Sequence, residues 1–363
     1  IEGEYTINDD LTVSVDGDVY WESNKPKLSV TFSEVTGKFD CSSSNLESLE
    51  GCPRKVKYFN CSHNKNLTSL EGGPKEAEDY YCVNCNLLSL KGAPKRVKIF
   101  YCYDNKNLTS LEGGPEEAEE YNCSNCNLLS LEGAPKKVKR FDCYNNKNLT
   151  SLEGGPEEAE EYYCFNCNLL SLKGAPKKVI SFYCSHNPNL TSLEGGPEEA
   201  EKYHCYDCNL LSLRGAPKKV EFFNFFNNNN LTSLEDGPEE AGYYYCFNCN
   251  LFSLRGAPKK VKRFDCKYNK NLTSLEGGPE EAEEYYCFNC NLLSLKGAPK
   301  KVIHFDCYNN KNLISLEGGP EEAEKYDCSN CNLLSLEGAP KKVKYFNFTN
   351  NPIYDELKKE GKL

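Results

Sequence analysis

The fold is decided by 41 residues, which read VKRFDCKYNKNLTSLEGGPEE (261–281) and then AEEYYCFNCNLLSLKGAPKK (282–301). We call the first 21 residues a longer unit and the next 20 a shorter unit. The pair recurs along the chain without slippage, and 16 units can be counted from Cys41 through the one at Phe348. One such unit cannot bury its own apolar side chains, but stacked units share a continuous core. The repeat therefore predicts a stack of coils, which also explains how 363 residues exceed the size of a single core.

Each unit begins with a strand pattern. Longer units read V-x-x-F-x-C-x-x-N-x-x-L, as in 261–272, and shorter units read A-x-x-Y-x-C-x-x-C-x-L, as in 282–292. Numbering from the Val or Ala, positions 1, 4 and 6 are apolar and are predicted to point inward, while positions 3, 5 and 7 share the outward face. Position 9 follows the strand, where an Asn side chain can cap backbone groups of a turn.

This pattern resembles the leucine-rich-repeat core, L-x-x-L-x-L-x-x-(N/C)-x-L. The 20-residue period resembles the short repeats of bacterial effectors, and the string LTSLEGxPxxVxxFxCxxN is similar to repeat proteins of tailed phages and giant viruses. The resemblance covers about residues 38–351 and departs in having Val or Ala, Phe or Tyr, and Cys at the strand Leu positions. It implies a right-handed β solenoid with one parallel sheet, about 16 coils and few helices.

The two ends depart from the repeat. Residues 1–37 contain LTVSVDGDVYW, whose alternation predicts a strand, and we expect an N-terminal β cap there with Trp21 as its seal. The tail IYDELKKEGKL predicts a short polar helix. The expected organisation is therefore a β cap at 1–37, a solenoid at 38–351 and a helical cap at 352–363.

Charged side chains alternate between the two kinds of unit. The strand is preceded by PKKVK in longer units and by PEEAE in shorter ones. Adjacent strands lie about 4.8 Å apart, so rows of Lys and Glu should face each other across every pair of coils. We expect this alternation to form a solvated ladder of charges that fixes the register.

Composition restricts the function. The net charge is −11, with 43 Lys and Arg against 54 Asp and Glu, which argues against nucleic acid and anionic membranes as partners. No apolar run approaches 18 residues and no signal peptide stands at the start. The chain has no Met, so a processed N-terminus remains open. A reducing cytoplasm or a virion is favoured as location, with secretion left open.

The 22 cysteines include seven C-x-x-C pairs, from Cys82/Cys85 to Cys328/Cys331. A first Cys within a strand would leave the second about 10 Å away, which does not suit zinc chelation. We expect buried thiols and no cofactor, with disulfides left open.

Four histidines lie in different coils and no phosphate-binding loop is present, so we expect no catalysis. Asn-Leu-Thr sequons belong to the repeat, and their glycosylation is left open.

Outward strand positions vary strongly between units and are rich in Phe and Tyr. The repeat degrades from Tyr206 to Phe252, where Phe225 replaces a core Cys and NNNN spans 227–230. Exposed aromatic clusters mark interaction sites. The candidate partner-binding residues are His204, Tyr206, Phe222, Phe226, Tyr243, Tyr245 and Phe247. The alternative is local repacking around Phe225.

We therefore expect a non-catalytic protein-binding solenoid, and the viral resemblance implies a product that engages a host or virion protein through the sheet face. A structural, assembly or decoration role, with self-association, is the alternative. Carbohydrate binding by the Tyr-rich face is a further one, with polar partners at Asp142, Asp265, Asp306 and Asp327.

Overall fold

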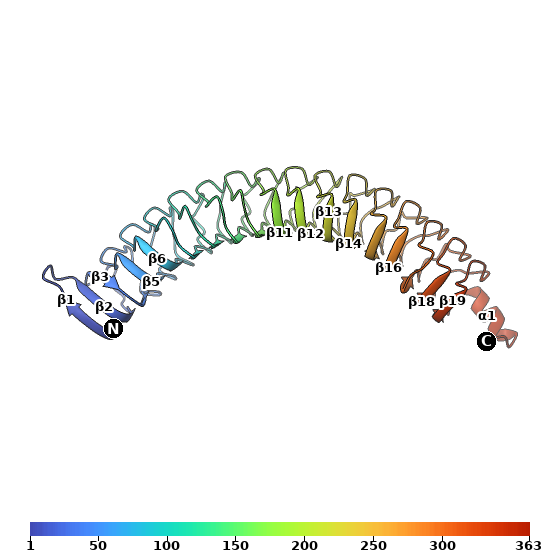
Figure 1. The fold of residues 1–363 in the computed structure, drawn as a ribbon, viewed down its shortest axis with the longest axis horizontal. Coiled ribbons are helices and arrows are strands. Elements are labelled where there is room, and N and C mark those ends of the chain that lie inside the picture. The colour runs from blue at the N-terminus through green and yellow to red at the C-terminus, as the bar shows by residue number, and fades with distance from the viewer. The chain divides into compact units, whose positions relative to one another are not determined.

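A computed structural model describes residues 1–363 (Figure 1). The elements in chain order are β1 (Glu2–Ile7), β2 (Val13–Tyr20), β3 (Phe32–Val35), β4 (Lys38–Asp40), β5 (Lys55–Asn60), β6 (Glu76–Tyr81), β7 (Ile99–Tyr101), β8 (Glu120–Asn122), β9 (Arg140–Asp142), β10 (Glu161–Tyr163), β11 (Lys178–Tyr183), β12 (Glu199–His204), β13 (Lys219–Asn224), β14 (Glu240–Tyr245), β15 (Lys260–Asp265), β16 (Glu281–Tyr286), β17 (His304–Asp306), β18 (Glu322–Asp327), β19 (Lys342–Asn347) and α1 (Pro352–Lys359). No helix is long and apolar enough to cross a membrane.

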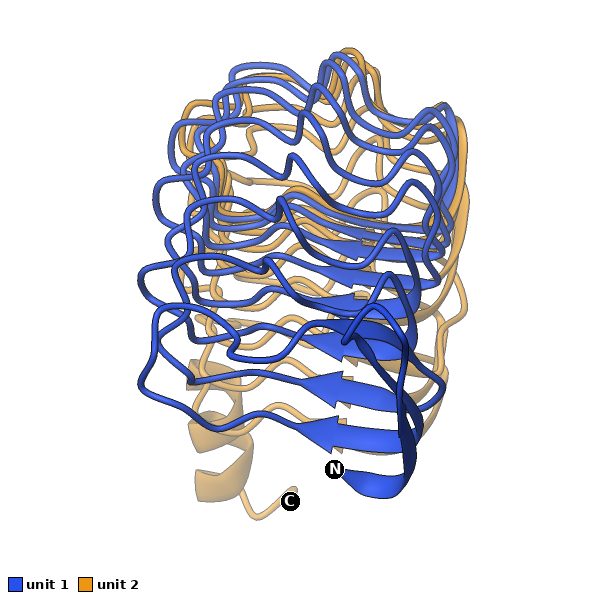
Figure 2. Cartoon of the chain, turned by 90° about the vertical axis from the view of Figure 1, so that its left-hand side faces the viewer, with its two compact units in different colours: residues 1–179 blue, residues 180–363 orange.

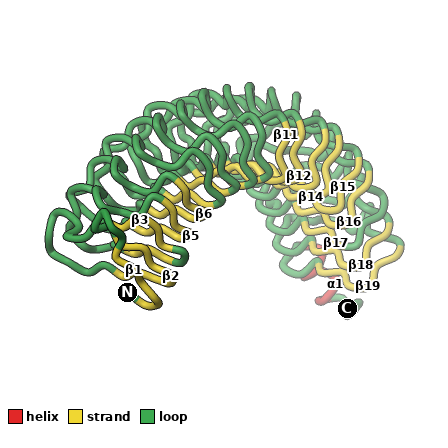
Figure 3. The backbone as a smooth tube through the Cα atoms, turned by 60° about the vertical axis from the view of Figure 1, so that its left-hand side comes forward, coloured by secondary structure: helices red, strands yellow, loops and turns green.

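The chain forms two compact units, unit 1 at Ile1–Val179 and unit 2 at Ile180–Leu363 (Figure 2). Inside each unit, strands of successive coils pair in parallel and in register. Val261 of β15 lies opposite Ala282 of β16, and Phe264 lies opposite Tyr285. Loops complete every coil beside the row of strands (Figure 3). The predicted β solenoid, with a parallel sheet and a single short C-terminal helix, is confirmed.

The core consists of the columns that the repeat predicted. Phe264 and Tyr285 at position 4, and Leu272 and Leu275 beyond the strand, are all 0% exposed. The position-4 rings of successive coils contact one another through the core, mostly at tilted angles, with 5.1 Å between the centroids of Phe264 and Tyr285. Since each coil covers the next, apolar burial increases with every coil added.

The strands are shorter than the sequence indicated. In unit 2 they end at position 5, so Cys287 follows β16, and the first Cys of each C-x-x-C pair does not lie within a strand as we expected. The chain turns at position 8, where Asn289 has a φ of 55°. This left-handed conformation is one that Asn adopts more readily than most residues, and it ends the ladder.

The charge ladder is present. Lys260 lies 2.7 Å from Glu281, and Lys219 lies 2.8 Å from Glu240. The predicted pairing of Lys rows with Glu rows is therefore confirmed. These side chains are well exposed, so each pair contributes little to stability and acts mainly on register.

The two ends differ. The polar helix α1 forms where the tail predicted one, and none of its residues is buried. β2 forms in the predicted N-terminal strand, but β1, which pairs antiparallel with β2, was not expected. The division into a cap at 1–37, a solenoid at 38–351 and a cap at 352–363 stays a prediction.

Candidate functional site

A row of position-7 side chains runs along the outward face of unit 2. We call it the outer row, and it consists of Tyr206, Phe226, Phe247, Lys267, Phe288 and Tyr308. Tyr206 and Phe226 stack with centroids 4.6 Å apart and ring planes 5° apart, and Phe226 stacks on Phe247 at 4.4 Å and 8°. Phe288 stacks on Tyr308 at 4.3 Å. The rings are parallel because neighbouring coils lie about one strand spacing apart.

Lys267 joins the two aromatic segments of the outer row. Its ammonium lies 4.6 Å from the centroid of the Phe247 ring and 5.4 Å from that of Phe288. The same nitrogen lies 3.0 Å from a carboxylate oxygen of Asp265. The Asp265 side chain is 1% exposed, and burial raises its pKa above the usual value although Lys267 lowers it. The cation is therefore held between two rings by a buried carboxylate.

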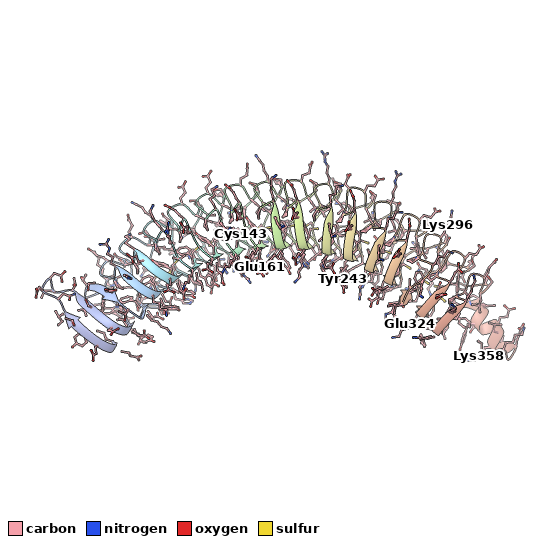
Figure 4. All side chains as sticks on the ribbon, in the orientation of Figure 1. Cys143, Glu161, Tyr243, Lys296, Glu324 and Lys358 are labelled. Carbon is pink, nitrogen blue, oxygen red and sulfur yellow. The ribbon has the colours of Figure 1, made fainter.

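A second aromatic group lies beside the outer row, at positions 3 and 5. The Phe222 ring lies 5.5 Å from His204, 5.6 Å from Tyr243 and 5.1 Å from Tyr245. The guanidinium of Arg263 lies 5.5 Å from the Tyr245 centroid. In unit 2, Tyr243 lies on the strand side of the coil, and Lys296 lies on the loop side (Figure 4). Phe222 is thus the centre of this group.

The structure brings all seven candidate residues together. Each lies on the outward face and is half-buried by its neighbours, so they form one surface rather than separate side chains. Burial lowers the pKa of His204 to about 4, which keeps its ring neutral at pH 7. Whether this surface binds a partner stays a prediction. The sequence prediction selected aromatic residues and His204, and therefore left out the cations Lys267 and Arg263. Both lie at outward positions of the repeat, which could have identified them.

Phe225 repacks the core, as the alternative interpretation expected. It is 0% exposed, and its ring lies 4.7 Å from Phe223 and 5.0 Å from Tyr244. The outward group and the inward repacking therefore occur in the same coils, and one does not exclude the other.

Stacking limits which parts of the rings in the outer row are accessible to a ligand. The faces of Phe226 are covered by Tyr206 and Phe247, so its ring presents an edge to solvent. A sugar or nucleobase needs a free ring face, whereas the grooves between ring edges suit methyl and methylene groups. At Phe226 the row therefore presents a ring edge and the grooves beside it, with no free ring face.

The carboxylates considered as sugar ligands are mostly occupied. Asp142 pairs with Arg140 at 3.0 Å, and its side chain is 6% exposed. Asp265 is engaged by Lys267, as described above. Asp327 accepts hydrogen bonds from Ser329 and Asn347. Asp306 lies directly opposite Asp327 on the neighbouring strand, and desolvation raises its pKa.

The cysteines fill structural columns. All 22 are buried, and no group of three or more His, Cys, Asp or Glu side chains is arranged to hold a metal ion. The thiol of Cys290, at position 9, lies 3.4 Å from the carbonyl oxygen of Cys266 in the preceding coil. Burial raises the pKa of Cys290 to about 12, so it carries little thiolate at neutral pH.

Comparison with known proteins supports the fold. No family model and no curated protein sequence matches this chain. Among solved structures, YopM from Yersinia enterocolitica WA-314 is similar, with a TM-score of 0.55 and 16% sequence identity over 93% of this chain and 87% of that chain. At this identity the likeness concerns the fold alone. The chain thus folds like YopM, a bacterial effector leucine-rich-repeat protein, as a stack of coils with a period of about 20 residues.

Proposed function

We propose that the protein is a non-catalytic binding protein that engages a protein partner through the outer row of unit 2. The observation that carries this proposal is the continuity of the row, in which Phe226 and Phe247 stack at 4.4 Å and Lys267 extends the row at 4.6 Å. Aromatic rings held rigid by stacking lose little conformational entropy on binding, and they are frequent among the residues that dominate interfaces. The viral resemblance makes a host or virion protein the proposed partner class.

The test replaces the centre of the row. The double variant Phe226→Ala with Phe247→Ala should keep the circular dichroism spectrum and lose the partner. Removing two rings from an interface centre should cost about 2 kcal/mol or more each, so affinity should fall at least a hundredfold. Partners captured from candidate host lysates by the unchanged chain are identified by mass spectrometry, and their affinity for both chains is then measured.

Unit 1 supplies a matched control. Tyr144 and Phe165 also stack at position 7, with centroids 4.5 Å apart and planes 6° apart. Tyr144→Ala with Phe165→Ala removes the same kind of stacked pair, and partner affinity should stay unchanged. Equal loss in both double variants would contradict the assignment to unit 2.

A second candidate function is self-assembly, which one observation favours. On unit 2, every shorter unit exposes a large apolar side chain after its first buried Leu: Leu211 (61%), Phe252 (61%), Leu293 (59%) and Leu334 (59%). Most longer units have Thr there, such as Thr273. A periodic row of exposed apolar side chains can pack against another copy that carries the same period.

Sedimentation of the full chain separates the two functions. Leu211→Thr, Phe252→Thr and Leu293→Thr in combination introduce the residue of the longer units, so the fold should persist. If the row mediates assembly, this variant should be monomeric where the unchanged chain is not. A monomeric unchanged chain at high concentration would remove this candidate and leave partner binding intact.

A further inference from the structure

The N-terminal edge of unit 1 ends in an unpartnered strand. β1 pairs only with β2, with Tyr5 opposite Val15 and Ile7 opposite Val13, and all six residues of β1 are exposed. Its other edge has no neighbouring strand. Proteins normally shorten, cover or block such edges, because unpaired backbone groups are a template for a further strand.

The core side of β1 is apolar and uncovered. Val13 and Val15 face the core and are 8% and 2% exposed. Their partners on β1 share that face, yet Ile7 is 63% exposed and Tyr5 is 61% exposed. The terminal coil of a solenoid normally presents a polar outer surface. Here the core face of the sheet continues onto β1 with no coil beneath it.

A cavity of about 410 Å³ opens at this place. Its lining is mainly apolar and includes Tyr5, Ile7, Val13, Trp21 and Phe32. Trp21 packs edge-on against Phe32 with centroids 6.5 Å apart, but its indole nitrogen is buried without an acceptor. A buried donor without a partner destabilises the site, and an acceptor on a bound segment would relieve that cost. Trp21 therefore lines an apolar pocket with one free donor, and its role as the seal of the first coil stays a prediction.

The other side of β1 is acidic. Glu2 lies opposite Asp18, and Glu4 lies opposite Asp16, so like charges face each other across the two strands. None of these four carboxylates has a basic side chain within ion-pair distance. The pKa of Tyr20 is raised, first by desolvation and then by the charges of Asp18 and Glu2. Like charges directly opposite each other destabilise a strand pair, so cationic side chains placed beside these carboxylates would stabilise it.

We propose that the free edge of β1 binds an extended segment of a partner protein in which large apolar side chains alternate with Lys or Arg. Added to β1, such a segment would place its apolar side chains over Tyr5, Ile7 and the cavity, and its cations over Glu2 and Glu4. Elsewhere in this chain, Glu-bearing strands lie beside Lys-bearing ones, as Glu281 beside Lys260. Strand addition draws affinity from main-chain hydrogen bonds and specificity from alternate side chains.

The chain itself provides the probe peptide. Residues 341–348, KKVKYFNF, alternate Lys342 and Lys344 with Val343 and Tyr345, and residues 280–286, EEAEEYY, give an acidic counterpart. Both peptides are synthesised with blocked ends and titrated into the full chain. Trp21 is the single tryptophan and lines the cavity, so its fluorescence reports binding. The basic peptide should cause a saturable change that weakens with salt, and the acidic peptide should not.

Variants distinguish the two sides of the strand. Glu2→Lys with Glu4→Lys should weaken the basic peptide at least tenfold and remove the salt dependence. Tyr5→Ser with Ile7→Ser should weaken it at any salt concentration. Asp355→Lys with Glu356→Lys in α1 makes the same charge change elsewhere and should have no effect. The proposal is overturned by equal binding of the acidic peptide, or by dimerisation of the chain through β1, abolished by the Tyr5/Ile7 variant, with no peptide binding.

Discussion

Longer and shorter units solve the same packing problem in two ways. In unit 2 the shorter unit places Tyr285 at position 4, and the corner before it contains Gly278. The longer unit places Phe305 there, and the corner before it contains Ala298. A Cβ built on Gly278 would lie 2.8 Å from the Tyr285 hydroxyl, although the backbone there has no positive φ. Glycine is needed here because the Tyr285 hydroxyl occupies the space that a methyl group would fill. In the longer unit Phe305 has no hydroxyl, and the corner can hold Ala298.

Position 9 shows the same division. Asn269 of the longer unit donates from Nδ2 to the carbonyls of Cys246 (3.0 Å) and Cys266 (2.8 Å), and its Oδ1 accepts from the amide of Leu251 (3.2 Å). Cys290 of the shorter unit offers only a thiol, whose sulfur lies 3.4 Å from the carbonyl oxygen of Cys266 and 3.7 Å from that of Phe288. At position 9, side-chain hydrogen bonds between coils are thus made mainly by the Asn of longer units. The Cys of shorter units mainly fills the space between coils. If this difference is real, equivalent substitutions in longer and shorter units should lower the unfolding free energy by different amounts.

The largest difference is expected at position 9. Asn269→Ala removes every side-chain hydrogen bond at this turn and leaves buried backbone groups unpaired, so unfolding free energy should fall by about 3–5 kcal/mol. Cys290→Ala removes one sulfur and a weak hydrogen bond and should cost about 1–2 kcal/mol. Urea unfolding followed by circular dichroism measures both. Similar losses would mean that Asn269 mainly fills space.

The next difference lies in the corner. Gly278→Ala should cost about 1–3 kcal/mol, because the methyl group overpacks against the Tyr285 hydroxyl. Tyr285→Phe removes the oxygen and recreates the pairing found in longer units. The double variant should therefore be more stable than Gly278→Ala alone, and a double-mutant cycle gives the coupling. Additive losses would show that Leu275 or Leu254, whose atoms also lie near this Cβ, sets the cost.

The sequence predicted the core columns and the C-terminal helix, but it did not predict the strand β1 at the N-terminal end. Columns at positions 1, 4, 6 and 9 follow from the period, since a residue such as Asn269 recurs every 41 residues and has one structural role. β1 has no second copy in the chain, so the repeat carries no information about it. The exact extent of strands was also missed, because the turn at Asn289 depends on one left-handed residue rather than on apolar spacing.

The candidate site was predicted by residue type and register together. The variable, aromatic outward positions pointed to seven residues around Phe222, and all of them lie in one surface. Their chemistry could not be anticipated, because stacking turns the face of Phe226 away from solvent. The placement of Lys267 between two rings depends on the buried Asp265, a contact that side chains two residues apart make only once the strand has formed.

The charge ladder should contribute less than either core feature. Glu321 lies 3.3 Å from Lys300 and 2.6 Å from Lys341, and Glu322 is bridged in the same way by lysines on both sides. Hydrogen bonds from these lysines lower the pKa of both glutamates. A carboxylate with a lowered pKa stabilises the fold above its unfolded pKa of about 4.3, and this is lost as the pH falls through the folded value. Glu321→Gln with Glu322→Gln should therefore lower Tm slightly at pH 7.

Salt and acid provide the controls for the charge ladder. The difference in Tm between this double variant and the unchanged chain should shrink in high salt, which screens exposed pairs. It should also vanish at a pH below the folded pKa of both glutamates. A difference that persists in acid would mean that the substitutions act through packing.

The smallest effect is expected at position 8, where longer units are more varied. Tyr268 has a φ of 59°, while the shorter units of unit 2 have Asn or Asp there, such as Asn289 with a φ of 55°. A bulky side chain in this conformation costs about 1 kcal/mol more than Asn. Tyr268 is 41% exposed and its ring meets Phe288 only edge-on at 5.5 Å, so removing the ring should cost less packing energy than the strained backbone does. Tyr268→Asn should therefore raise Tm by a small amount, and Asn289→Tyr should lower it. A lower Tm for Tyr268→Asn would show instead that the Tyr268–Phe288 contact supports the outer row, which would make Tyr268 part of the binding surface.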